Sequence, residues 1–326
     1  MGLRGYVVKR AIYSVILVFL VITINFAIFM VRSPVEMLAS EQKLPLAVIE
    51  ELQMRFGLFE PLHIRYLKYL QNLLTFQFGY SYYTGGPISE EVGSRLSNTL
   101  ILCITAEIVA VAIGLIVGVA ASHKRGKITD TLSSLFSVVT QGLPVFWIGM
   151  LLLLIFSYSL GWFPSGHSEP PEWAIHGKPA NFLIELAARL WHLFLPALTL
   201  VIISVGSYVL LTRASMLEVL GEDYLITLKA KGLGNIKILF KHALKNASLP
   251  LVTQVAIAFA FTLSGALVTE TIFTYPGLGM WIWKSIEEWD YPALQAIFYL
   301  VSLCVIVTNF IVDIIYGVID PRIRYE

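Results

Sequence analysis

The sequence predicts an all-α integral membrane protein with six transmembrane helices. Of its 326 residues, 57% are hydrophobic and only 14% are charged, and the mean hydropathy is +0.75. A soluble domain cannot bury that much apolar surface. The apolar residues also gather in blocks of about twenty, the length that a helix needs to cross ~30 Å of hydrocarbon.

The six candidate spans lie at residues 11–31, 98–121, 132–156, 195–212, 250–270 and 293–317. The first block follows three basic residues, as the core of a signal peptide does. It is longer than such a core, however, and no small-residue cleavage site follows it, so we expect an uncleaved anchor. The third block contains Pro144, which can kink a helix either to shape a pathway or to fit its neighbours.

The distribution of basic residues predicts the orientation. Fourteen Lys and Arg residues lie in the N-terminal segment, the second and fourth connections and the C-terminal tail, whereas the third and fifth connections carry three. The first connection is too long to count fully. Basic connections stay on the cytoplasmic side, so both termini are expected to be cytoplasmic, with the chain in the cell membrane as a multi-pass protein.

The first connection, residues 32–97, is too long for a plain loop and is predicted to form an extracytoplasmic helical extension. Pro45 and Pro61 each stand where an amphipathic helix can begin. We therefore expect two parts, with residues 1–97 forming an N-terminal anchor helix and its extension. Residues 98–326 would form a core of five spans.

The fourth connection, residues 213–249, is polar and predicts a short helix, a turn and a second helix. A Gly-Glu-Asp sequence at 221–223 ends the preceding helix and favours the start of a new one that runs to Lys231. A further helix at 235–246 is basic on one face and apolar on another. On charge alone, this connection would equally suit a segment lying on anionic lipid headgroups.

The residues of this connection resemble the cytoplasmic signature of ABC importer permeases, specifically the B-type permease of the dipeptide and oligopeptide branch. The matching segments there are MLEVLGEDY at 216–224, AKGL at 230–233 and HALKNA at 242–247. Further matches are FGYS at 78–81, GPI at 86–88, LPVFWIG at 143–149, LGWFP at 160–164, ETIF at 270–273, YPGLG at 275–279, DYP at 290–292 and DPRIRY at 320–325. One departure is Ile-Thr-Leu at 226–228, where the general importer signature has Glu-Ala-Ala, and it leaves open which ATPase surface is contacted.

The resemblance implies the type I ABC importer permease fold and a coupling loop at about 214–249 whose short helix docks into a cleft on an ATPase. The apolar contact with the ATPase is expected to come from Tyr224, Leu225 and Leu228. Charged neighbours are expected to fix the position of the helix in the cleft through polar contacts, and Gly232 is expected to turn the chain. The complete set of expected coupling residues is Glu222, Asp223, Tyr224, Leu225, Leu228, Lys229, Ala230, Lys231, Gly232 and Leu233.

The same resemblance implies the partners. They are a second homologous permease, expected to form a heterodimer with this chain, two ATP-binding cassette ATPases and an extracytoplasmic solute-binding protein. ATP and Mg²⁺ would bind to the ATPases, and this chain is expected to bind no cofactor. Importers of this branch carry dipeptides, oligopeptides, nickel chelates or oligosaccharides, and the sequence leaves that choice open. A net charge of +1 gives no indication of nucleic-acid binding.

Several residues inside the spans are candidates for the pathway or for helix packing. Small residues recur every four positions from Ala106 to Ser122, a pattern typical of close helix approach. Glu107 lies at membrane depth, where an ionisable group needs a partner or a function. Asp313 is expected to anchor the sixth span or to pair with Arg213. The full set of pathway or packing candidates is Glu107, Gly114, Gly118, Pro144, Phe146 and Trp147.

Other functional classes have little support in the sequence. No G-x-x-x-x-G-K-[ST] loop occurs, and no His lies inside a span to work with Ser or Glu107, so no catalytic residue is assigned and the chain is not expected to be an enzyme. The histidines at 167, 176 and 192 match no metal motif, so no metal is expected. An ion-coupled secondary transporter is the remaining alternative, since a broken span and a membrane glutamate can serve ion coupling.

Overall fold

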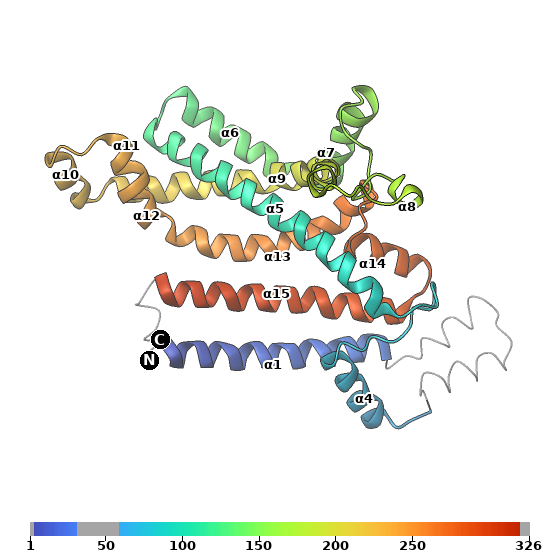
Figure 1. The fold of residues 1–326 in the computed structure, drawn as a ribbon. Coiled ribbons are helices and arrows are strands. Elements are labelled where there is room, and N and C mark those ends of the chain that lie inside the picture. Colours follow the sequence, from blue (N-terminus) through green and yellow to red (C-terminus); the bar gives the residue numbers. More distant parts are fainter. Residues whose placement is uncertain (1–2, 31–58, 320–326) are drawn as a thin grey trace. The chain divides into compact units, whose positions relative to one another are not determined.

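The computed structural model describes residues 3–30 and 59–319, and this part of the chain is helical (Figure 1). The β-structure in it is an isolated bridge between Tyr80 and Pro87. The helix expected from Pro45 and the tail segment at 320–325 lie outside the described residues. The helix expected from Pro61 is present, because α4 begins directly after that proline.

The elements in chain order are α1 (Leu3–Met30), α4 (Leu62–Leu74), α5 (Ile88–His123), α6 (Ile128–Gly142), α7 (Val145–Leu152), the π-helix η1 (Leu153–Ser159), α8 (Trp173–His176), α9 (Phe182–Leu220), α10 (Asp223–Ala230), α11 (Asn235–Lys237), the π-helix η2 (Ile238–Ala243), α12 (Leu244–Ala247), α13 (Leu249–Ile272), α14 (Leu278–Glu287) and α15 (Tyr291–Ile319).

Within these described ranges, α1, α5, α9 and α15 are long and apolar enough to cross a membrane. Helix α13 covers the fifth expected span over 24 residues. The fourth expected span, 195–212, forms only the middle of α9, which has 39 residues. The prediction of a multi-pass helical membrane protein is therefore confirmed, while the count of six spans stays a prediction.

The third expected span is not one helix. Helices α6 and α7 meet at an angle of 102°, and the break falls at Leu143 and Pro144, which both have extended backbone. Proline lacks the N–H that would continue the helix, and its ring disfavours helical geometry in the preceding residue. The kink expected at Pro144 is thus a complete interruption, and the residues 132–156 form two helical pieces.

The chain divides into two compact units, of which the first consists mainly of residues up to Ser97 together with Trp281–Gly317. In this unit α1 lies along α15. The Asn25 side-chain amide donates to the Gln295 carbonyl at 3.0 Å, and Arg10 pairs with Asp313 at 3.1 Å. The expected pairing of Asp313 with Arg213 is therefore wrong.

The carboxylate of Asp290 connects the start of α15 to the segment that precedes α5 in the same unit. It accepts hydrogen bonds from the Ser81 hydroxyl, from the Tyr82 backbone N–H at 3.0 Å and from the Ala293 N–H in the first turn of α15 at 3.3 Å. Burial and the charge of Asp290 both raise the pKa of the Tyr82 phenol. These bonds hold the FGYS segment (78–81) against the DYP segment (290–292), although the two segments are far apart in the sequence.

The second unit consists mainly of Asn98–Met280, and α9 is its central helix. Helices α5, α6 and α13 pack around α9, and Tyr208 of α9 is fully buried. A Cβ atom on Gly114 of α5 would overlap Tyr208, so the helices approach as closely as they do only because that residue is glycine. Arg213 near the end of α9 donates two hydrogen bonds to Asp130 of α6, one of them at 2.9 Å.

Candidate functional site

The loop that carries the coupling residues begins where α9 ends. Helix α9 stops at Leu220, with Gly221 as its C-cap, and α10 starts at Asp223 after an extended Glu222. An acidic side chain in the first turn interacts favourably with the helix dipole. The predicted break and restart are confirmed at the positions that the sequence indicates.

Helix α10 ends in a Schellman motif. The Gly232 N–H donates to the Lys229 carbonyl at 2.9 Å, and the Leu233 N–H donates to the Leu228 carbonyl at 3.3 Å. Gly232 has φ of +78°, a left-handed conformation that glycine adopts without steric cost. Leu228 and Leu233 also pack on the same hydrophobic cluster, as the motif favours. The turn expected at Gly232 is confirmed.

The chain then returns to the membrane-spanning part as a nearly continuous helix made of α11, η2 and α12 (Figure 1). The Ser248 N–H donates to the Leu244 carbonyl at 2.8 Å, and the Val252 N–H donates to the Ser248 carbonyl at 3.3 Å. These bonds join α12 to α13 without a gap. A displacement of the loop therefore has a direct helical connection to α13.

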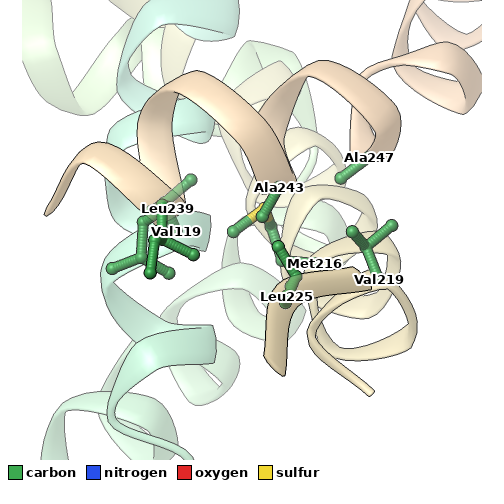
Figure 2. Close-up of a cluster of buried hydrophobic side chains, with 8 residues drawn as sticks. Val119, Met216, Val219, Leu225, Leu239, Ala243 and Ala247 are labelled. Atoms are coloured by element: carbon green, nitrogen blue, oxygen red, sulfur yellow. The ribbon is translucent and has the colours of Figure 1, made fainter. Parts of the chain in front are cut away.

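A cluster of buried apolar side chains, here called the loop core, holds α10 in place. Figure 2 shows how its side chains meet. Its members are Val119 of α5, Met216 and Val219 of α9, Leu225 of α10, and Ile238, Leu239, Ala243 and Ala247 of the returning helix. The loop core thus fixes the short helix against both the end of α9 and the end of α5.

The loop core corrects the expected role of the apolar residues of α10. Leu225 is 2% exposed and lies inside the loop core, and Tyr224 and Leu228 are partly buried against it. The Tyr224 hydroxyl also accepts a hydrogen bond from Asn246 Nδ2 at 3.1 Å. Leu225 therefore supports the helix from within and has no surface to offer a partner, and the other two offer only part of theirs.

The opposite face of α10 is exposed. The expected coupling residues that are exposed, on α10 or directly beside it, are Glu222, Asp223, Lys229, Ala230, Lys231 and Gly232, while Leu233 is half-buried. Sequence reasoning missed Ile226 and Thr227, which also lie on this face, and Ile226 is 64% exposed. The three-residue interval between Leu225 and Leu228 already marks the buried face, and it would have placed Ile226 outside.

Among the pathway or packing candidates, Glu107, Gly114 and Gly118 make contacts between helices. Glu107 is 4% exposed and accepts hydrogen bonds from the Tyr208 hydroxyl and from Thr262 Oγ1 at 3.2 Å. Gly118 faces Thr212 of α9, as Gly114 faces Tyr208.

Three further candidates lie at the break before α7 or in its first turn. Pro144 is the N-cap of α7 and is exposed. Phe146 is 51% exposed and Trp147 is 46% exposed. Aromatic side chains with this much free surface suit contact with lipid or with another chain.

Another buried carboxylate, which the sequence indicated only as part of ETIF, lies at the end of α13. Glu270 is fully buried and accepts from Thr99 Oγ1 at 2.6 Å, from the Gly279 N–H at 2.6 Å and from the Met280 N–H at 3.2 Å. The carboxylate therefore caps the first turn of α14 and bonds to α5 with its other oxygen. A buried charge needs such donors.

The comparisons with known proteins agree with this architecture. The family model of binding-protein-dependent transport system inner membrane components matches residues 110–325. The chain is 38% identical over 304 residues to the di/tripeptide transport system permease protein DppB of Pseudomonas aeruginosa, with 90% of each chain covered. It is 36% identical over 321 residues to the dipeptide transport system permease protein DppB of Escherichia coli K12, with 94% of each chain covered.

A third relative extends the match to almost the full length. The oligopeptide transport system permease protein AppB of Bacillus subtilis is 34% identical over 326 residues, which cover 99% of this chain and 100% of the relative. Among solved structures, a chain of the inward-facing MetNI methionine ABC transporter has a TM-score of 0.55 at 16% identity, covering 70% of this chain and 96% of that one. The likeness to this last structure concerns the fold alone.

Proposed function

The chain belongs to the family of binding-protein-dependent transport system inner membrane components, and we propose that its helix α10 couples ATP hydrolysis to transport. It is a permease subunit of an ABC importer, as its relatives are. The alternative of an ion-coupled secondary transporter receives no support from these relatives.

One observation carries the proposed role of α10. The helix is held on one side by the loop core, through Leu225, and presents charged and apolar side chains on the other, among them Asp223, Ile226 and Lys229. A short helix that is held rigidly on one side and exposed on the other suits a groove on a moving partner. Its two flanks continue into α9 and α13, so motion of the partner would reach the spans directly.

The proposed complex contains this chain, a second homologous permease as a heterodimeric partner, two ATPases and an extracytoplasmic solute-binding protein. ATP and Mg²⁺ would bind on the ATPases, because this sequence lacks a phosphate-binding loop. We place α10 and both termini on the cytoplasmic side, in line with the distribution of basic residues. The solute-binding protein would then deliver its substrate to the extracytoplasmic connections between the spans.

Small peptides are the proposed substrates. The relatives are named for di- and tripeptides, dipeptides and oligopeptides, and this chain is similar to them over nearly its whole length. Nickel chelates and oligosaccharides are the less supported alternatives. The solute-binding protein of the proposed complex should gain thermal stability with dipeptides, because a ligand that binds only the folded state raises the melting temperature.

Reconstitution in liposomes tests the function as a whole. The complete complex should import dipeptides only when ATP is supplied to the ATPase side. This chain alone should neither hydrolyse ATP nor move dipeptides down a proton or sodium gradient. Uptake by the isolated chain that follows an ion gradient and ignores ATP would overturn the proposal in favour of a secondary carrier.

A further inference from the structure

Two hydrogen bonds between buried side chains join α5 to α13, and they are reciprocal. At one position Thr99 of α5 donates to Glu270 of α13 at 2.6 Å. At the other, Thr262 of α13 donates to Glu107 of α5 at 3.2 Å. Each helix therefore supplies one carboxylate and one hydroxyl, and all four side chains are at most 5% exposed.

The spacing of these bonds matches antiparallel packing of the two helices. From Thr99 to Glu107 the chain advances eight residues along α5, and from Thr262 to Glu270 it advances eight along α13. Eight residues of α-helix rise about 12 Å, or slightly more than two turns. The two bonds thus fasten α5 to α13 at two levels, which resists both sliding and rotation of one helix against the other.

Each carboxylate also has a second partner on another helix. The other oxygen of Glu107 accepts from Tyr208 of α9. The other oxygen of Glu270 accepts from the Gly279 and Met280 N–H groups at the start of α14. Glu107 of α5 consequently bonds to α9 and to α13, the two helices on either side of the α10 loop. Glu270 bonds the far end of α13 to α14.

We propose that Glu107 and Glu270 are positioning residues that make α5 and α13 move as one rigid pair, so that displacement of the α10 loop reaches the start of α14. This inference rests on the proposed function. In a low-dielectric interior a carboxylate that loses its hydroxyl donor finds no substitute from water. Removal of the two threonine hydroxyls should therefore loosen α5 from α13, and at Thr99 also from the start of α14, because the Leu278 N–H donates to the Thr99 hydroxyl at 2.8 Å. The apolar packing between the helices remains.

The test uses the complete complex in liposomes, with dipeptide uptake and ATP hydrolysis measured on the same samples. The variants are Thr99→Val, Thr262→Val and the two combined, because valine keeps the size and branching of threonine. The matched control is Thr199→Val, since Thr199 is fully buried but its hydroxyl bonds only to the Leu195 carbonyl of its own helix, at 2.9 Å. Thr262→Ser restores the hydroxyl.

We expect the combined variant to import about fivefold less dipeptide per ATP, a typical size for coupling between two sites. Thr199→Val and Thr262→Ser should keep the wild-type ratio. An assembled combined variant with the wild-type ratio would overturn the inference and leave the proposed function intact. An equal fall in dipeptide imported per ATP in Thr199→Val would also overturn the inference, since the loss would then follow from the removal of any buried hydroxyl. A wild-type complex without ATP-dependent uptake would instead refute the proposed function.

Discussion

Replacement of Gly232 by alanine should weaken coupling through backbone geometry alone. Gly232 has φ of +78°, and a Cβ atom added there would meet nothing within 4 Å. The substitution therefore creates no clash with neighbouring atoms, and its cost arises only from the left-handed conformation. For residues with a Cβ this conformation costs about 1–2 kcal/mol. The population of the native turn, relative to opened forms of the loop, should fall roughly 5–30-fold.

Gly234 offers a matched control two residues away. A Cβ atom added at Gly234 would also meet nothing within 4 Å, but the φ of this residue is −66°, which alanine adopts without strain. Asparagine tolerates the left-handed region better than alanine does. The expected order of ATP-dependent dipeptide uptake is wild type and Gly234→Ala, then Gly232→Asn, then Gly232→Ala.

The assay compares uptake by the reconstituted complex with the amount of ATPase that co-purifies with the permease. Both should fall in Gly232→Ala, while insertion of the permease into the membrane stays normal because the turn lies outside the expected spans. Equal uptake by Gly232→Ala and Gly234→Ala would refute the reasoning, since the two positions differ in backbone conformation and not in available space.

Three further predictions concern topology, the loop core and helix packing. Cysteines at Ser89 and Lys124 should react with a membrane-impermeant thiol reagent from opposite faces, and labelling from one face would contradict the expected orientation. Leu225→Ala should destabilise the loop by about 2–5 kcal/mol because it opens a cavity in the loop core, seen as faster proteolysis. Ile226→Ala should leave proteolysis unchanged and reduce only ATPase co-purification. Gly118→Ala should lower the melting temperature of the purified permease, because overpacking costs about 1–3 kcal/mol; an unchanged value would show that α5 and α9 have room to separate.

Local signals in the sequence predicted the local structure of the loop well. Gly221 and Gly232 stand at the two ends of α10, as glycine and acidic-residue rules indicate. The exposed side of α10 was less well predicted. Leu225 is conspicuous as an apolar residue in a polar loop, and only the presence of Met216 and Ile238 beside it reveals that its surface is already used.

Long-range pairings escaped prediction because their partners are distant in sequence. Asp130 and Arg213 are separated by 83 positions, and no local pattern links them. The break at Pro144 was foreseen as a kink, since proline acts locally. Its 102° angle depends on what packs around the two pieces. Glu107 was recognised as a residue that needs a partner, but the two hydroxyl donors lie on other helices.

The loop core also affects how a complex containing this chain would assemble. Ordering the backbone of the eight residues of α10 costs on the order of 10 kcal/mol of conformational entropy, and here that loss occurs when the permease itself folds. A subunit that binds α10 would therefore meet a finished surface and need not order a flexible peptide. Association of this kind proceeds as rigid-body docking, with more of the contact energy left to slow dissociation.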